Sequence, residues 1–170
     1  MNNRSDFSDK FSTIFVVDDN KINLEIIKAS LPKTYEVFLI QSASKMFQLI
    51  TKKQPDLILL DVDMPTMSGF EAIKILKSQP ETQPIPVIFL SSRSDVKSLQ
   101  LGLELGAADF LVKPVQPKLL LKNVELHLSV IFHQKVLERQ QKTLDSNKKE
   151  LNNYKNDFDI LLNPQNSFLN

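Results

Sequence analysis

One stretch of the sequence decides the fold class, LILLDVDMPTMSGFEA at residues 57–72. It opens with an unbroken aliphatic run, which is typical of a strand buried on both faces of a sheet. Asp61 stands at the end of that run. After a polar loop, Ala72, Ile75 and Leu76 recur with the spacing of one helix face. The stretch therefore predicts a strand, a loop and a helix in succession, which is the repeating unit of an α/β fold.

Four further apolar runs extend this pattern in both directions. They are TIFVV (13–17), YEVFLI (35–40), PVIFLS (86–91) and DFLVK (109–113). Residues that end helices follow the segments between the runs, at Pro32, Pro55, Pro80 and Gly106. Five strands that alternate with helices predict a parallel sheet covered by helices on both faces.

Apolar residues between the strands predict which helix faces pack on the sheet. The predicted faces are Ile22, Ile26, Ala29 and Ser30; Ala43, Met46, Phe47 and Ile50; and Val96, Leu99 and Leu103. Asn20, Ser42 and Ser94 precede these three sets, so we expect the three helices to begin after them.

Polar residues stand at the ends of four of the five runs. Asp18 and Asp19 follow the first run, Asp61 ends the third, Ser91 ends the fourth and Lys113 ends the fifth. Ligands of open α/β sheets bind beyond the carboxyl ends of the strands, so we expect these side chains to converge there. Three crowded carboxylates repel one another unless a cation joins them, and Mg²⁺ is a cation that prefers oxygen ligands.

The same residue types suit phosphoryl transfer. A carboxylate such as Asp61 is a competent nucleophile for phosphorus. The Lys113 ammonium, the Ser91 hydroxyl and a bound Mg²⁺ would each neutralise an oxygen of the transferred group. Each residue also has a structural alternative, because aspartate caps helices and ends strands in turns, lysine forms salt bridges, and serine often ends a strand.

Four blocks resemble the signature blocks of response-regulator receiver domains, the phosphoryl-accepting modules of two-component signalling. They are VVDDN (16–20), LILLDVDMPTMSGFEA (57–72), PVIFLSS (86–92) and GAADFLVKP (106–114). The blocks occur in the family's order, and the resemblance covers residues 12–130. It implies a doubly wound, flavodoxin-like α/β fold with five parallel strands in the order 2-1-3-4-5.

The resemblance implies a metal site and an acceptor. Asp61 matches the phosphoacceptor, and Asp18 and Asp19 match the acidic pair that holds Mg²⁺ or Mn²⁺. Asp63 matches the position whose backbone carbonyl completes the metal shell. Arg93 and Asp63 both stand two residues beyond site positions, and the hypothesis is that they form an exposed ion pair that shields the phosphoryl group from water.

The resemblance also implies a switch. Ser91 matches a hydroxyl that moves toward the phosphoryl group, and Phe110 matches an aromatic residue that follows it, although Phe110 is equally well explained as a core residue. Lys113 matches a lysine of the phosphorylation site, whose bond to Pro114 is typically cis in this family.

The function implied is signal receipt, with a sensor histidine kinase or a phosphotransfer protein as the phosphoryl donor. Such a domain is not an enzyme with an external substrate, since it catalyses only its own phosphorylation and dephosphorylation. One alternative is a receiver that is never phosphorylated and serves as a dimerisation or interaction module. A second is a haloacid-dehalogenase-like phosphatase, which expects its DxD motif on the first strand, whereas Asp61-Val62-Asp63 follows the third.

The C-terminal third of the sequence predicts a long helix. From Pro117 no Gly or Pro occurs until Pro164, and Val130, Leu137, Leu144, Leu151 and Phe158 recur every seven residues. The heptad spacing predicts a parallel dimeric coiled coil, with a solvated helical tail as the alternative. The block NVELHLSVIFHQKVLERQQ resembles linkers that precede cyclic-dinucleotide cyclase or phosphodiesterase domains, so the chain is expected to be a fragment or a stand-alone receiver with a stalk.

Composition sets the remaining expectations. The net charge is +1, from 21 basic and 20 acidic residues, so neither nucleic acid nor a membrane surface is expected as a partner. The chain has no cysteine and no run long enough to span a membrane, and a cytoplasmic location is expected.

The expected domains are a disordered lead (1–10), a receiver domain (11–130), a coiled-coil helix (131–162) and a disordered tail (163–170). His127 and His133, six residues apart, are expected to be surface or packing residues.

Overall fold

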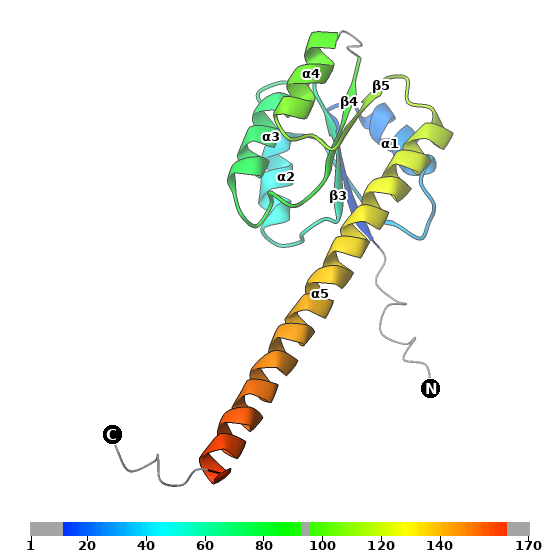
Figure 1. Ribbon diagram of the computed structural model, residues 1–170. Coiled ribbons are helices and arrows are strands. Elements are labelled where there is room, and N and C mark those ends of the chain that lie inside the picture. Colours follow the sequence, from blue (N-terminus) through cyan, green and yellow to red (C-terminus); the bar gives the residue numbers. More distant parts are fainter. Residues whose placement is uncertain (1–11, 93–95, 163–170) are drawn as a thin grey trace. The chain divides into compact units, whose positions relative to one another are not determined.

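The computed structural model describes residues 12–92 and 96–162, and five strands alternate with five helices in that part of the chain (Figure 1). The elements are β1 (Thr13–Val17), α1 (Lys21–Ala29), β2 (Glu36–Ile40), α2 (Ala43–Ile50), β3 (Leu57–Asp61), α3 (Gly69–Ser78), β4 (Val87–Ser91), α4 (Val96–Glu104), β5 (Asp109–Val112) and α5 (Pro117–Leu162). The chain divides into two units between Ser129 and Val130, so α5 contributes its first turns to the first unit and the rest to the second.

The sheet is parallel throughout, with the strand order β2-β1-β3-β4-β5. The predicted fold class and strand order are therefore confirmed. Every residue of β1, β3 and β4 is buried, which explains why these strands read as continuous apolar runs. The core has two halves: α2 and α3 cover one face of the sheet, and α1 and the first turns of α5 cover the other.

Side-chain caps begin three of the helices. Asn20 accepts a hydrogen bond from the backbone amide of Ile22, and Ser42 accepts one from that of Lys45, so both predicted helix starts are confirmed. Ser68 and Glu71 form a reciprocal capping box at the start of α3. Ser94, after which another helix was expected to begin, lies outside the described residues.

The predicted packing face of α1 is wrong. Ile22 and Ile26 lie on the solvent side, with Ile22 69% exposed, whereas Leu24 and Ile27 are buried against the sheet. The helix carries two apolar faces, and the buried one is the face that also contacts Asp18, a residue outside the helix. Asn23 donates two hydrogen bonds to Asp18, and its side chain shares an arc of roughly 100° with Leu24 and Ile27.

The predicted packing face of α4 is also wrong. Val96 is 75% exposed and Leu103 is exposed, while the buried residues of this helix are Ser98 and Gly102. A Cβ at Gly102 would lie 3.2 Å from the ring of Phe89, so large aromatic residues of the sheet already fill the space. A pattern of large apolar residues cannot reveal a helix that packs through small ones.

The loop between β3 and α3 contains a strained residue, Thr66, whose φ is 72°. A β-branched residue is disfavoured in this left-handed region, whereas glycine adopts it freely. We expect Thr66→Gly to raise the free energy of unfolding by about 1 kcal/mol. Urea denaturation measures the change, and Thr51→Gly is the matched control because Thr51 has a φ of −68°. If Thr66→Gly were no more stable than the parent protein, the conclusion that the Thr66 backbone is strained would be wrong.

The second unit is the remainder of α5, from Val130. Several of its large apolar residues are exposed, among them Leu137, Leu144 and Leu151. Among the described residues, no helix combines the length and the hydropathy that a membrane span requires.

Candidate functional site

The predicted site residues lie at one edge of the sheet. Asp18 follows β1, Asp61 ends β3, Ser91 ends β4 and Lys113 follows β5, and all four strands point the same way. The strand register brings the ends together, because Asp61 lies beside Leu90. The backbone amide of Lys113 donates to the carbonyl of Ser91 at 2.8 Å, which continues the ladder beyond β5. The expected cis bond between Lys113 and Pro114 is present.

Lys113 joins two of the carboxylates. Its Nζ lies 2.6 Å from Asp18 Oδ2 and 2.8 Å from Asp61 Oδ1. Asp18 is fully buried and Asp61 nearly so. Burial raises the pKa of the Asp61 carboxyl above its ordinary value, and the hydrogen bond and charge of Lys113 only partly offset this effect. Burial also lowers the pKa of Lys113, but its contacts with Asp18 and Asp61 outweigh burial, so its pKa is raised and the ammonium stays charged.

Three carboxylates form an acidic cluster at the same place. Asp18, Asp19 and Asp61 each offer an oxygen, and these oxygens lie within 4.8 Å of one another. Asp19 is exposed, so the cluster opens to solvent on its side. One ammonium leaves the negative charge of three carboxylates partly uncompensated. A small divalent cation with oxygen ligands and a solvent-facing side fits this donor set.

Asn23 is a site residue that the sequence analysis missed. Its Nδ2 donates to both oxygens of Asp18, each at 3.1 Å, and the backbone amide of Asn20 donates to Asp18 Oδ1 at 2.9 Å. These bonds fix the orientation of the Asp18 carboxylate. The available signal was a polar residue in the first turn of α1, five positions after Asp18.

The two predicted switch residues lie on neighbouring strands. Ser91 is fully buried at the end of β4. Phe110 is half-buried in β5 and packs edge-on against Phe89, with the ring centroids 6.2 Å apart. Phe110 therefore lies at the edge of the hydrophobic core. This position is compatible with both expected roles, as a core residue and as a switch residue.

Gly69 allows the backbone after β3 to pass close to α3. Its amide donates to the carbonyl of Val62 at 2.9 Å, and a Cβ at this position would lie 2.4 Å from the backbone oxygen of Asp61. The position of Asp61 thus depends on the absence of a side chain at residue 69.

The other residues singled out in the sequence lie away from this site or outside the described residues. Arg93 lies outside the described residues, so its pairing with Asp63 stays a hypothesis. His127 is half-buried, with Nε2 3.5 Å from Asp109 Oδ2, and His133 is exposed and packs edge-on against Phe132. Both environments agree with surface or packing roles.

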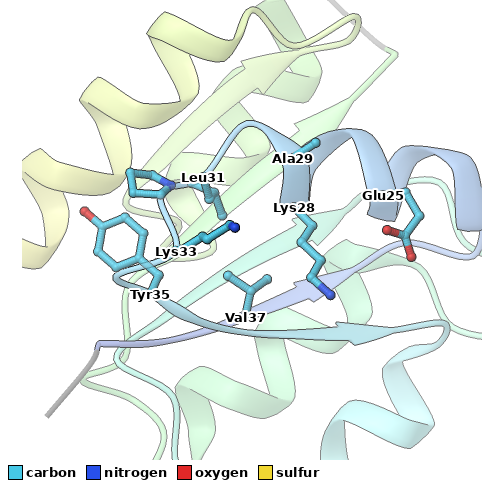
Figure 2. A pocket seen from close by; sticks show the side chains of 8 residues that line it. Glu25, Lys28, Ala29, Leu31, Lys33, Tyr35 and Val37 are labelled. Carbon is cyan, nitrogen blue, oxygen red and sulfur yellow. The ribbon is translucent and has the colours of Figure 1, made fainter.

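A depression of about 490 Å³ lies between α1 and β2 (Figure 2). Leu31, Tyr35 and Val37 line it together with Lys28 and Lys33. Burial and the charge of Glu125 raise the pKa of the Tyr35 hydroxyl. The depression contains none of the residues at the carboxyl edge of the sheet, so the chemistry described above does not extend to it.

Comparisons with known proteins agree with this geometry. The profile of the response regulator receiver domain family matches residues 14–125. The chain is 37% identical over 134 residues to a probable cyclic di-GMP phosphodiesterase of Vibrio cholerae, covering 79% of this chain and 30% of the relative. It is 38% identical over 112 residues to the response regulator PleD of Caulobacter vibrioides, covering 65% and 25%. The chain thus spans less than a third of the length of these relatives.

Among solved structures, the chemotaxis protein CheY4 of Vibrio cholerae superposes with a TM-score of 0.64 at 29% identity. The match covers 68% of this chain and 98% of CheY4.

Proposed function

The chain belongs to the response-regulator receiver domain family, and on this premise we propose that Asp61 accepts a phosphoryl group. The observation that carries the proposal is the position of the Asp61 carboxylate, 2.8 Å from the Lys113 ammonium and within the acidic cluster. Receiver domains are signalling modules that act with histidine kinases or phosphotransfer proteins. The proposed donor is therefore a phosphohistidine on such a partner.

In the proposed transfer, a carboxylate oxygen of Asp61 attacks the phosphorus atom of the phosphohistidine. The O–P bond forms as the P–N bond breaks, and the imidazole of the donor leaves with the electron pair. Lys113 gives up its contact with Asp61 Oδ1 to neutralise an oxygen of the transferred group. Attack by water on the phosphorus then restores the carboxylate, so the domain would catalyse only its own phosphorylation and dephosphorylation.

Asp18, Asp19 and Asp61 would hold Mg²⁺ or Mn²⁺, with the backbone carbonyl of Asp63 as a further ligand. The hard carboxylate oxygens and the open side at Asp19 support this assignment. When bound, the metal ion would neutralise charge on the phosphoryl oxygens. Asn23 would keep the buried Asp18 carboxylate in the orientation that the metal requires.

The response to phosphorylation would pass through Ser91 and Phe110. The buried Ser91 hydroxyl would turn toward the phosphoryl group, and Phe110 would follow into the space that this movement opens. The two residues stand on adjacent strands, and Phe110 already contacts the core through Phe89. This switch would bias a pre-existing equilibrium at the surface of α4, β5 and α5.

Residues 130–162 of α5, here called the stalk, would bind a second copy of the chain. Val130, Leu137, Leu144, Leu151 and Phe158 recur every seven residues and are between 45% and 67% exposed. A helix with large exposed apolar residues at heptad spacing buries them by pairing with another helix. The proposed state of the full chain is therefore a homodimer.

Labelling with acetyl phosphate tests the assignment of Asp61. We expect Mg²⁺-dependent incorporation of phosphate into the parent protein and none into Asp61→Asn, with chelation of Mg²⁺ abolishing the label. Asp145→Asn, the same substitution at an exposed residue of the stalk, should label normally. If the parent protein takes up no label, the chain is better described as a receiver that acts without phosphorylation. If Asp61→Asn labels like the parent, the phosphoryl group is on another residue and the assignment of Asp61 is wrong.

Removing the Asn23 amide should weaken the metal site. In Asn23→Ala the Asp18 carboxylate loses two hydrogen bonds that orient it, and we expect the dissociation constant for Mg²⁺ to rise about tenfold. Titration calorimetry measures the affinity, and Asn152→Ala on the exposed stalk is the control. Unchanged Mg²⁺ binding in Asn23→Ala would remove Asn23 from the site.

A further inference from the structure

The stalk carries a second pattern beside its apolar residues. The five apolar residues named above form what we call the seam. Four residues after the first four seam residues stand Gln134, Gln141, Lys148 and Lys155, which form the basic flank. Six residues after the same four stand Val136, Thr143, Glu150 and Asp157, which form the acidic flank. In the C-terminal half of the stalk, one side of the seam is thus positive and the other negative.

These flanks discriminate between the two orientations of a helix pair. In a parallel, in-register coiled coil, each residue of the acidic flank lies beside a residue of the basic flank on the partner helix. The residue number of that partner is higher by five. Glu150 then faces Lys155 of the partner subunit, and the symmetric contact forms as well. Both contacts are attractive.

An antiparallel pair brings like flanks together. The two basic flanks would then place Lys148 close to Lys155 of the partner subunit, and the two acidic flanks would place Glu150 close to Asp157 of the partner subunit. Like charges at these positions repel. The seam residues favour neither orientation, because apolar residues pack equally well in parallel and antiparallel pairs.

We propose that two copies of the chain pair through the stalk as a parallel, in-register coiled coil, and that the contact between Glu150 and Lys155 of the partner subunit selects this orientation. This inference rests on the proposed dimer and adds its geometry. The 33 residues of the stalk comprise more than four heptads, the length at which heptad patterns become reliable. Both copies then begin the stalk, at Val130, from the same end.

The absence of cysteine allows a direct test, since any introduced cysteine is the only one in its chain. Gln140 and Tyr154 stand three residues after a seam residue, on the inner side of a heptad pair. In the parallel dimer each faces its own copy. We therefore expect Gln140→Cys alone and Tyr154→Cys alone to form disulfide-linked dimers on mild oxidation of the full chain. Lys142→Cys, on the outer side of the helix, is the control and should remain largely unlinked.

The outcomes separate the two proposals. If the chain sediments as a dimer, neither Gln140→Cys nor Tyr154→Cys links alone, and Tyr154→Cys links when mixed with Leu151→Cys, the pair is antiparallel and the inference is overturned. If the chain is a dimer and no combination links, the in-register pairing is likewise wrong. If the unmodified chain sediments as a monomer at tens of micromolar, the proposed homodimer itself fails, and with it the inference.

A charge reversal provides a second readout. Glu150→Lys places two repulsive contacts in a parallel dimer, and we expect the dimer dissociation constant to rise roughly tenfold. Glu138→Lys makes the same change outside both flanks and should alter the constant by less than about threefold. An antiparallel dimer would instead become tighter with Glu150→Lys, because the repulsion from Asp157 of the partner subunit turns into attraction.

Discussion

Gly69→Ala is expected to destabilise the receiver domain by about 3 kcal/mol and to slow labelling by acetyl phosphate at least ~100-fold. The new Cβ would lie 2.4 Å from the backbone oxygen of Asp61 and 2.9 Å from the Cα of Val62. Backbone atoms at the end of a fully buried strand cannot move aside as a side chain can. The strand end and the first turn of α3 must therefore separate, which displaces the acceptor carboxylate.

Gly102→Ala is the matched control for this variant. Gly102 is also a buried helical glycine, but a Cβ there would meet only side chains, at 3.2 Å from Phe89 and 3.5 Å from Phe110. Alanine also favours the helical conformation by up to about 1 kcal/mol over glycine. We expect a change in the free energy of unfolding of less than about 1 kcal/mol. If both variants unfolded at the same denaturant concentration, the backbone contact of Gly69 would not be decisive.

Lys113→Met is expected to lower the free energy of unfolding by about 2–3 kcal/mol without metal and to slow labelling by at least ~100-fold. Methionine keeps most of the apolar stem but removes the ammonium that lies between Asp18 and Asp61. The two buried carboxylates then face each other without a cation. This is slightly less than breaking a fully buried ion pair costs, because Lys113 retains some solvent contact.

Mg²⁺ sharpens this prediction. A divalent ion at the acidic cluster supplies the missing positive charge, so it should stabilise Lys113→Met more than it stabilises the parent protein. Thermal unfolding with and without Mg²⁺ measures the difference. Lys53→Met is the control, because Lys53 pairs with Glu36 on the surface and should contribute less than about 1 kcal/mol. A Lys113→Met variant that labels at the parent rate would exclude Lys113 from the transfer.

The sheet and the ionic part of the site could be predicted because their signals are local. A strand buried on both faces must be apolar along its length, so β1, β3 and β4 are visible as uninterrupted runs. Parallel strands then place Asp61 and Lys113 at one edge, whatever the details of the loops. The contact between Lys113 and Asp18, which are 95 residues apart, follows from topology alone.

The helix faces and the role of Asn23 could not be predicted in the same way. Helix α1 has apolar residues on two faces, and the hydrogen bonds from Asn23 to Asp18 accompany the face that is buried. Helix α4 packs through Ser98 and Gly102, whose small size has meaning only beside the large rings of the sheet. Both features depend on contacts between elements, which hydrophobic periodicity within one helix does not record.

Asp61 is the single acceptor in the proposed transfer, and locating the phosphoryl group tests this most directly. Borohydride reduction converts an aspartyl phosphate to homoserine, which marks the labelled residue permanently. After treatment with acetyl phosphate and Mg²⁺, peptide sequencing by mass spectrometry should find homoserine at residue 61. Homoserine at Asp18, Asp19 or Asp63 instead, or its absence from all four positions in protein that has bound Mg²⁺, would contradict the account.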